Sequence, residues 1–459
     1  MILLSLVLFH GVQGQEVAGR WSGSLDAGGM KLRLVFNLEK GEGGYTATMD
    51  SPDQGALGIE VPQVAVAGSE VTLAIPAMGL EYKAALKGKE MEGTFKQGPV
   101  TLPLKLTRTE GKSPLVLRPQ EPQPPYPYEI REVTFINRHD SIQLTGTLTL
   151  PEGEGPFPAV ILISGSGPQN RDEEIFGHRP FWVIADHLTR KGIAVLRYDD
   201  RGTAASRGNF NTATTLDFGR DAEHAFRFLK TRPDIDPQHI GLLGHSEGGI
   251  IASMIAAHYE EVGFMVLLAG TGIRGDSLLL LQQETMMRTM GVDQATITRS
   301  HGINKGAFDL INVFGGTDQL KQKLILYLQG VYGGMSEKEK QGLSQEVFIG
   351  RTLNQIMNPW MEFFVRFSPC PDLTGIKCPV LALNGSNDVQ VPAGVNLNAI
   401  RTCLEKGGNR AVTTREYPGL NHLFQECKTG LPSEYGEISQ TISPAVLEDI
   451  SSWILDRVK

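Results

Sequence analysis

The sequence predicts an α/β fold in which helices cover both faces of a mostly parallel sheet, preceded by a small antiparallel β domain. In residues 129–459, short and wholly apolar segments alternate with segments of helical spacing. Strands that are apolar throughout are typical of a parallel sheet buried on both faces. In residues 15–110, apolar and polar positions alternate with a period of two, which indicates antiparallel strands.

The N-terminal region, residues 15–110, contains seven or eight such alternating runs, each closed by glycine, aspartate or proline. This number of short strands predicts a small barrel or sandwich. The letters GRWSGSL near its start resemble lipocalin-like barrels, which bind apolar ligands. We favour the alternative, a β module without a ligand of its own.

Residues 111–128, GKSPLVLRPQEPQPPYPY, contain six prolines and mark the predicted domain boundary. Proline fixes its backbone angle and lacks an N–H donor, so this density excludes a helix. The composition predicts an extended, semi-rigid linker.

The region after the linker opens with two alternating strands, EVTFIN and QLTGTLTLP, and continues with apolar strands and helices in turn. The apolar strands are VILIS, AVLRYD, IGLLG and FMVLLAG. Helical spacing of apolar residues predicts helices over about residues 178–190, 215–230 and 247–258.

The stretch GLLGHSEGGI holds a G-x-S-x-G pattern from Gly244 to Gly248, between an apolar strand and an apolar helical run. A serine at such a strand-to-helix turn is the setting of a nucleophile elbow. The turn strains the backbone of the serine, and the flanking positions need glycine because side chains do not fit there. Ser246 is therefore the predicted nucleophile.

Two further residues follow late strands. Asp388 lies in the polar turn after the apolar run LALNG, and His422 lies in the loop after TTREYP. A serine hydroxyl is a weak nucleophile unless a histidine takes its proton and a carboxylate fixes the tautomer of that histidine. We therefore predict a triad of Ser246, Asp388 and His422.

The segment PAVILISGSGPQNRDE runs from an apolar strand into a Gly-Ser-Gly turn. A tetrahedral intermediate needs preorganised N–H donors. We expect one from the backbone N–H of Glu247, directly after the nucleophile. The other is expected from Ser166, with Gly167 as the alternative.

Several charged residues beside these segments are expected to serve the scaffold. For the side chains of His245 and Glu247, we favour packing and solvent contact over catalysis. An ion-pair network that holds loops is expected of Asp199, Asp200 and Arg201, and loop bracing, with substrate contact as the alternative, of Arg171 and Asp172.

The blocks ILISGSGPQNRDE, RYDDRGTAASRG, GLLGHSEGG, LALNGSNDVQVP and YPGLNHLFQ together resemble a bacterial α/β-hydrolase group. This esterase-like group is related to the serine aminopeptidases and to acyl-thioesterase-like hydrolases. The resemblance covers about residues 129–459 and implies the α/β-hydrolase fold, with Ser246, Asp388 and His422 as the triad. One departure is Ala204, where similar sequences carry glycine; it concerns the flexibility of a loop, because no triad role falls there.

Residues 275–368 interrupt the alternation and are largely helical in pattern. In α/β-hydrolases, an insertion at this place forms a cap over the nucleophile. Its methionines and aromatic residues predict a deformable apolar surface. We expect most of these side chains to pack inside the cap and a few to line an acyl pocket. These residues are Met286, Met287, Met290, Trp360, Phe363, Phe364 and Phe367.

Composition narrows the function classes. The formal net charge is −8 and no Lys/Arg-rich run occurs, so nucleic acid is not an expected partner. The ten histidines form no H-E-x-x-H spacing, and no G-x-x-x-x-G-K-[ST] loop is present. We expect no metal, no nucleotide and no other cofactor, and the sequence leaves the oligomeric state open.

Residues 1–14 are predicted to be a signal peptide, with an apolar core of eight residues from Ile2 to Phe9 and small residues before a cleavage site after Gly14. This run is too short to cross a membrane, so no stable membrane insertion is expected. No Lys or Arg precedes the run, and a buried first strand is the alternative. A signal peptide implies export, to a periplasm or to the extracellular space.

The four cysteines, Cys370, Cys378, Cys403 and Cys427, all lie in the last 90 residues. In an exported protein they have three ways to pair, and we expect a Cys403–Cys427 bridge. Cys378 precedes an apolar strand and is expected in the core. A zinc site is not indicated, because no C-x-x-C spacing occurs.

These observations favour a serine carboxylesterase that cleaves a small-molecule ester with a short to medium acyl group. An aminopeptidase or acyl-thioesterase with the same triad is the alternative. An aminopeptidase needs clustered acidic residues to hold an amine, and the glutamates of the insertion are scattered along the sequence. A lipid- or carbohydrate-binding protein without activity is a third hypothesis, which the complete triad disfavours.

Overall fold

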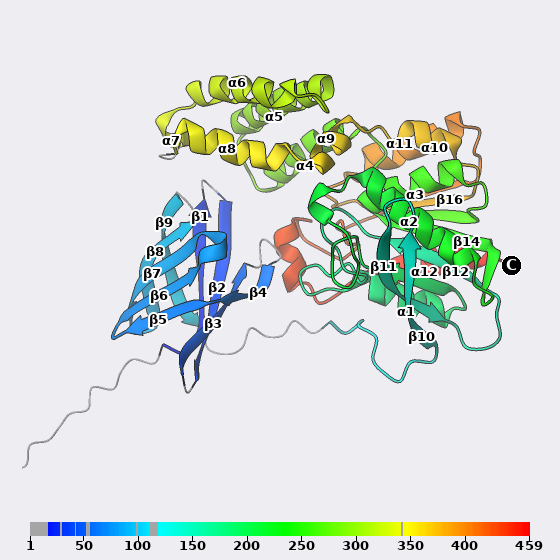
Figure 1. Ribbon diagram of the computed structural model, residues 1–459, viewed down its shortest axis with the longest axis horizontal. Coiled ribbons are helices and arrows are strands. Elements are labelled where there is room, and N and C mark those ends of the chain that lie inside the picture. Colours follow the sequence, from blue (N-terminus) through cyan, green and yellow to red (C-terminus); the bar gives the residue numbers. More distant parts are fainter. Residues whose placement is uncertain are drawn as a thin grey trace, which may run out of the picture. The chain divides into compact units, whose positions relative to one another are not determined.

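The computed structural model describes residues 17–27, 30–41, 43–51, 56–97, 100–109, 118–340 and 343–459 (Figure 1). The chain divides into two compact units, with the division between residues 115 and 116. The predicted signal peptide, residues 1–14, lies outside the described residues, so export stays a prediction. Within the described ranges, no helix combines the length and the apolar character needed to span a membrane.

The first unit contains one antiparallel sheet of nine strands, where the alternation predicted seven or eight. The strands are β1 (Gly19–Ala27), β2 (Met30–Gly41), β3 (Gly44–Ser51), β4 (Ala56–Val61), β5 (Gln63–Ala67), β6 (Glu70–Ile75), β7 (Leu80–Lys87), β8 (Glu90–Gln97) and β9 (Val100–Thr109). Their order is β4-β3-β2-β1-β9-β8-β7-β6-β5. Because β3 also contacts β5 and β4 contacts β6, the two ends of this order approach each other, as in a barrel.

Large side chains on alternate positions fill the core of the first unit. Trp21, Phe36 and Tyr82 are fully buried there. The hydroxyl of Tyr82 lies 3.0 Å from the carbonyl oxygen of Met91, to which it donates. A buried tyrosine needs such an acceptor, because the loss of hydration of its hydroxyl is otherwise uncompensated.

The described part of the predicted linker, residues 118–128, is grouped with the second unit. The guanidinium of Arg118 donates to the main-chain oxygens of Phe176, at 2.9 Å, and Gly436, at 3.0 Å. Tyr128 donates to the carboxylate of Asp186 at 2.7 Å. The sequence predicted a spacer, whereas hydrogen bonds attach both ends of this stretch to the second unit.

The second unit is built around an eight-stranded sheet with the order β10-β11-β13-β12-β14-β15-β16-β17. The strands are β10 (Glu129–Asn137), β11 (Ile142–Leu150), β12 (Phe157–Ile163), β13 (Ala194–Tyr198), β14 (Ile235–His245), β15 (Phe264–Leu268), β16 (Val380–Gly385) and β17 (Val412–Tyr417). The pairings from β13 to β17 are parallel, but β10 with β11 and β11 with β13 are antiparallel. The predicted mostly parallel sheet is therefore mixed, because its first two strands form an antiparallel hairpin at one edge.

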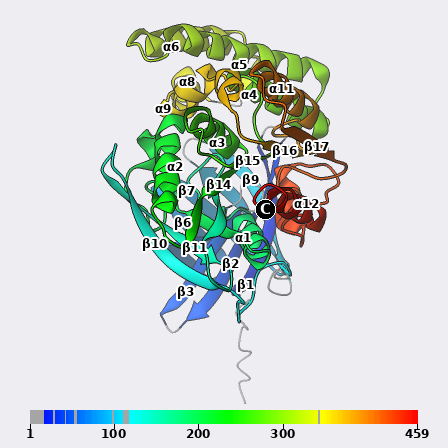
Figure 2. The same ribbon diagram turned by 90° about the vertical axis from the view of Figure 1, so that its right-hand side faces the viewer.

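Helices cover both faces of this sheet (Figure 2). Helices α1 (Pro180–Arg190) and α12 (Pro444–Leu455) pack on one face, and α2 (Thr215–Lys230), α3 (Glu247–His258), α10 (Cys370–Gly375) and α11 (Ala393–Lys406) pack on the other. The side chains beneath them form one hydrophobic cluster per face. The three helices predicted from helical spacing are confirmed, and their ends agree within two residues.

The insertion is helical, as predicted. It contains α4 (Gly275–Thr289), α5 (Gln294–Phe314), α6 (Gln319–Gly333), α7 (Glu337–Lys340), α8 (Gln345–Ile356) and α9 (Pro359–Arg366). A separate cluster that includes Phe308, Leu324 and Val365 holds α5, α6 and α9 together. Helix α9 also contacts α2, so α9 joins the insertion to the helices over the sheet (Figure 1).

A disulfide links Cys370 on α10 to Cys403 on α11, with the two Cα atoms 5.4 Å apart. The predicted Cys403–Cys427 bridge is therefore wrong. Packing of the two helices brings together cysteines 33 residues apart, whereas Cys427 accepts a hydrogen bond from Asn387 at 3.6 Å. Cys378 packs against the core as predicted, and burial raises its pKa to about 12.

A buried histidine makes the stability of the second unit depend on pH. The ring nitrogens of His178 lie 3.0 Å from the hydroxyl of Thr441 and 2.8 Å from the carbonyl oxygen of Tyr435. Burial lowers the pKa of His178 from 6.5 to about 4. The unfolded chain therefore binds this proton more readily than the folded chain between these two values.

We expect the contribution of His178 to be complete above pH 6.5 and to be lost as the pH falls to about 4. The full loss amounts to about 3 kcal/mol of unfolding free energy. Urea unfolding at several pH values measures it, with the His178→Gln variant as the reference. The variant should be less stable at pH 7 and lose less stability on acidification; equal pH slopes for the two proteins would contradict the assignment.

Candidate active site

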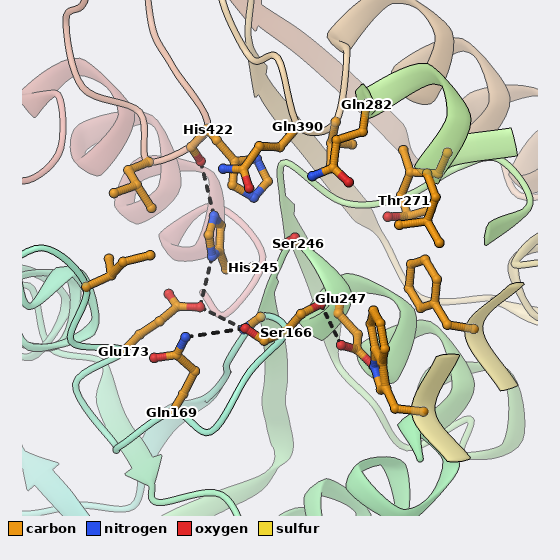
Figure 3. A pocket seen from close by; sticks show the side chains of 18 residues that line it. Ser166, Gln169, Glu173, His245, Ser246, Glu247, Thr271, Gln282, Gln390 and His422 are labelled. Carbon is orange, nitrogen blue, oxygen red and sulfur yellow. Dashed lines mark hydrogen bonds and ion pairs between the residues drawn. The ribbon is translucent and has the colours of Figure 1, made fainter. Parts of the chain in front are cut away.

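A cavity of about 220 Å³ lies at the carboxyl ends of the parallel strands, where sheets of this kind bind ligands (Figure 3). Ser166 comes from the turn after β12, Ser246 from the junction of β14 and α3, and His422 from the loop after β17. The insertion contributes Leu278, Leu279 and Gln282 from α4 and Trp360 and Phe364 from α9. Both the sheet and the insertion therefore form the walls of the cavity.

The backbone at Ser246 has the strain expected of a nucleophile elbow. Strand β14 ends at His245 and α3 begins at Glu247, so that Ser246 alone makes the turn. Its φ of 54° and ψ of −118° are unfavourable for a residue with a side chain. A Cβ at Gly244 would lie 2.1 Å from the carbonyl oxygen of Gly248. This close approach explains why the pattern has glycine at that position.

Asp388 and His422 meet beside the cavity. Nδ1 of His422 lies 2.7 Å from Oδ2 of Asp388. The other carboxylate oxygen accepts from the backbone N–H groups of Gln390 and Val391, each at 2.8 Å. Asp388 is 3% exposed and His422 5%. A proton held on Nδ1 leaves Nε2 of His422 free to act as a base.

Ser246 and His422 line the same cavity. No hydrogen bond between the Ser246 hydroxyl and Nε2 of His422 is formed within the described part of the chain. A long or poorly aligned bond is common for a nucleophile and its base before substrate binds. The structure thus brings the three predicted triad residues to one place, with one of the two expected contacts made.

Both predicted oxyanion donors are available. The backbone N–H groups of Ser166 and Glu247 donate to no protein acceptor among the residues described, and both residues line the cavity. The preceding N–H, that of Gly165, is occupied because it donates to Oε1 of Glu173 at 2.7 Å. Gly167, the alternative donor, is not among the residues that line the cavity.

The carboxylate of Glu247 is 2% exposed and accepts three hydrogen bonds. The donors are the hydroxyl of Ser166 at 2.7 Å, the hydroxyl of Thr215 at 2.6 Å and the indole N–H of Trp360 at 2.8 Å. Burial raises the pKa of Glu247, and these three donors oppose that shift. The expected solvent contact is therefore wrong: the side chain joins α2 and the insertion to the Gly-Ser-Gly turn at residues 165–167. This turn is called the oxyanion turn below, because it carries the predicted donor Ser166.

The charged residues behind this turn brace it, as predicted. The guanidinium of Arg171 makes two hydrogen bonds to the carboxylate of Asp199, at 3.1 and 2.8 Å. Asp200 accepts from the hydroxyl of Ser164 at 2.7 Å, at the end of the strand that leads into the turn. Two further ion pairs, Arg197 with Asp172 and Arg201 with Asp221, extend the network.

Comparison with known proteins places this geometry in a family context. Residues 222–329 match the family described as BAAT / Acyl-CoA thioester hydrolase C terminal. The chain is also 34% identical over 161 residues to the esterase EstD of Thermotoga maritima, a match that covers 35% of this chain and 36% of EstD. The chain is an α/β-hydrolase. It belongs to the esterase-like superfamily that is related to the acyl-thioesterases.

Two further similarities are more distant. The α/β-hydrolase is 24% identical over 171 residues to the peroxisomal succinyl-coenzyme A thioesterase of Mus musculus, covering 37% of this chain and 36% of that protein. A solved structure of an esterase from Pyrococcus furiosus aligns with a TM-score of 0.42 and 16% identity, over 72% of this chain and 91% of that one. The chain spans little more than a third of the length of these two curated relatives.

Five polar residues that line the cavity were not identified from the sequence: Gln169, Glu173, Thr271, Gln282 and Gln390. Gln282 follows Leu278 by four residues on α4, so helical spacing gave a signal that could have placed it on the same face. For Glu173, the sequence gave no such signal. In the described ranges, no group of three or more His, Cys, Asp or Glu side chains is arranged to hold a metal ion.

Proposed function

We propose that this α/β-hydrolase is a serine carboxylesterase that cleaves esters of short to medium acyl groups through an acyl-enzyme. The observation that carries the proposal is the strained turn at Ser246, which shares a cavity with a histidine bonded to Asp388. A general base fixed by a carboxylate next to an elbow serine is the arrangement that acyl transfer needs.

In the proposed reaction, Oγ of Ser246 attacks the ester carbonyl and its proton passes to Nε2 of His422. The N–H groups of Ser166 and Glu247 stabilise the negative charge that develops on the carbonyl oxygen. The bond to the alcohol oxygen breaks as His422 returns the proton to that oxygen. Water, activated by His422, then attacks the acyl-enzyme and releases the carboxylic acid and free Ser246.

The size and character of the cavity support a short to medium acyl group. Its volume of about 220 Å³ is below the roughly 300–1,000 Å³ of sites that hold drug-sized ligands. On the side of the insertion, Leu278, Leu279, Trp360 and Phe364 form an apolar wall. An apolar wall favours an uncharged chain, because burial of each methylene contributes about 0.8 kcal/mol.

A chain-length series of nitrophenyl esters tests this proposal. We expect kcat/KM to rise by up to about fourfold per added methylene and then to fall once the chain outgrows the cavity. Leu279→Phe, which narrows the cavity, should move the maximum to a shorter chain. Leu326→Phe, at an exposed position of α6, serves as the matched control and should leave the maximum in place. A profile that does not depend on chain length would contradict the proposed acyl site.

An acyl-thioesterase with the same triad is the second candidate. The family match to acyl-CoA thioester hydrolases favours it. A comparison of oxygen esters and thioesters of one acyl group decides between the two, because the acyl site is then constant. The two kcat/KM values are first corrected for the difference in uncatalysed rates. A corrected kcat/KM that is more than about tenfold higher for the thioester than for the ester would favour the thioesterase.

The aminopeptidase alternative has weaker support. Two carboxylates, those of Glu173 and Glu247, line the cavity, but each already accepts hydrogen bonds from protein groups. A substrate ammonium would have to compete with those donors after losing its hydration. Aminoacyl nitroanilides are therefore expected to be poor substrates in the same assay series, and efficient nitroanilide cleavage with weak ester turnover would instead favour the peptidase.

A further inference from the structure

A second histidine lies directly beside the predicted base. The ring centroids of His245 and His422 are 4.8 Å apart. Nε2 of His245 lies 3.1 Å from the main-chain carbonyl oxygen of His422. Because His245 precedes Ser246 in the chain, this contact is a short connection from the nucleophile to the backbone of the base.

The other ring nitrogen of His245 contacts a buried carboxylate. Nδ1 lies 2.9 Å from Oε1 of Glu173, which is 3% exposed (Figure 3). The same oxygen accepts the N–H of Gly165, the residue before the predicted oxyanion donor, at 2.7 Å. One carboxylate oxygen therefore holds the oxyanion turn and His245 together.

The chemistry of these contacts restricts where the protons lie. A carbonyl oxygen only accepts hydrogen bonds, so Nε2 of His245 must carry a hydrogen. Nδ1 faces a carboxylate, which accepts when it is ionised. With both nitrogens protonated, His245 is a cation paired with the Glu173 anion. Burial opposes this charge, but the field of Glu173 and its hydrogen bond raise the pKa of His245 above its ordinary value.

Apolar side chains also surround the pair. They come from α1, the end of β15 and the loops around His422: Phe181, Ile184, Leu268, Leu423, Phe424 and Ile442. In such surroundings an ion pair is weakly screened by water, and either member alone would be costly to bury. The pair therefore has a strong preference for one geometry.

We propose that Glu173 and His245 are positioning residues that set the oxyanion turn, the nucleophile and His422 relative to one another. This inference rests on the proposed function, because it assigns the pair a part in the same reaction. Glu173 fixes the turn through Gly165, and His245 fixes the main chain of His422. Asp388 holds only the side chain of His422, so the two contacts act on different parts of that residue.

The pair also affects the charge of His422. The titratable groups that face His245 are Glu173, His422 and, beyond His422, Asp388. A cation at His245 disfavours a second positive charge on His422, because the two rings are close. If Glu173 loses its charge, His245 loses its counter-ion and becomes neutral. The repulsion between the two rings is then removed.

The test uses Glu173→Ala and Glu173→Gln in the full-length enzyme, with rates normalised to the active sites titrated by a fluorophosphonate. For Glu173→Ala we expect kcat to fall by about 100-fold while KM changes less than threefold, because misplaced reacting groups affect chemistry more than binding. Glutamine keeps an acceptor for Gly165 and can donate to Nδ1 of a neutral His245. The kcat of Glu173→Gln should therefore be at least about tenfold higher than that of Glu173→Ala.

The pH profile separates positioning from a role in folding alone. In Glu173→Gln, the acid limb of kcat/KM should move to higher pH by about half a unit or more. Asp186→Asn is the matched control, because Asp186 is a partly buried carboxylate on α1 that accepts hydrogen bonds from Tyr128 and Arg190 and does not line the cavity. It should lower stability but keep kcat and the acid limb.

Unchanged kcat per titrated site and an unmoved acid limb in Glu173→Gln would overturn the proposal. If Glu173→Ala does not fold, the acid limb of Glu173→Gln still decides. Ser246→Ala is measured in parallel, so that a failure of the positioning role can be distinguished from a failure of the proposed function. Activity in Ser246→Ala rejects the serine mechanism, whereas an inactive Ser246→Ala with unaffected Glu173 variants rejects only the positioning role.

Discussion

Replacement of Ser246 with alanine is expected to lower kcat for ester hydrolysis by about four orders of magnitude or more. The serine supplies the oxygen that forms the acyl-enzyme, and alanine offers no nucleophile in its place. The oxyanion donors and the cavity remain, so weak catalysis by water attack persists and KM should change little. Steady-state kinetics on a nitrophenyl ester of optimal chain length measures the effect.

Ser253→Ala is the matched control for this experiment. Ser253 lies on the same helix, α3, is 3% exposed, and donates to the carbonyl oxygen of Gly249 at 2.8 Å. Its loss removes a buried hydroxyl near the elbow without removing the nucleophile, so kcat should stay within a few-fold of the wild type. A Ser246→Ala variant that keeps more than about a hundredth of the wild-type kcat would contradict the assignment.

Asp388→Asn is expected to lower kcat by about 10³- to 10⁴-fold at neutral pH. Asparagine has nearly the shape of aspartate, and its oxygen can replace one acceptor. Its amide, however, can donate to Nδ1 of His422, which selects the tautomer with the hydrogen on Nε2. That tautomer cannot take the proton of Ser246.

The loss of kcat in Asp388→Asn should not result from unfolding. Circular dichroism and urea unfolding of the variant are therefore measured beside the kinetics. Asp372→Asn, at a half-buried carboxylate on α10, is the control and should retain wild-type kcat. If Asp388→Asn keeps kcat within about tenfold, another carboxylate orients His422 and the assignment of the acid is wrong.

Local sequence patterns predicted much of the second unit. The spacing of apolar residues placed α1, α2 and α3 within two residues of their observed ends, because amphipathic helices carry their burial pattern in the sequence. The glycines at positions 244 and 248 indicated the elbow for a steric reason that is now visible, since a side chain at either position meets backbone atoms. Ala204, the one departure from the resemblance, has a positive φ of 46°, a conformation that glycine adopts more readily.

Contacts between distant segments could not be predicted in the same way. The disulfide partner of Cys403 depends on how α10 packs against α11, and four cysteines alone do not encode that choice. The mixed character of the sheet depends on β11 pairing with β13 rather than with a parallel neighbour. These features arise from the tertiary arrangement, for which spacing within one element gives no signal.

The burial of the two acids of the site, Glu173 and Glu247, was not predicted, for a related reason. A carboxylate is usually exposed to solvent, and neither the polar stretch around Glu173 nor the glycines beside Glu247 indicated otherwise. In the structure they are 3% and 2% exposed, because protein donors replace their water. Those donors, Gly165 and His245 for Glu173 and Thr215 and Trp360 for Glu247, come from other segments of the chain.

The proposed mechanism depends on Ser246 being an activated nucleophile. The measurement that tests it most directly is covalent labelling with a fluorophosphonate followed by mass spectrometry of the digested protein, on the wild type, Ser246→Ala and Asp388→Asn. We expect one label per chain on Ser246 of the wild type, none on Ser246→Ala, and slow labelling of Asp388→Asn. A label on another residue, or labelling of Ser246→Ala at the wild-type rate, would contradict the proposed mechanism.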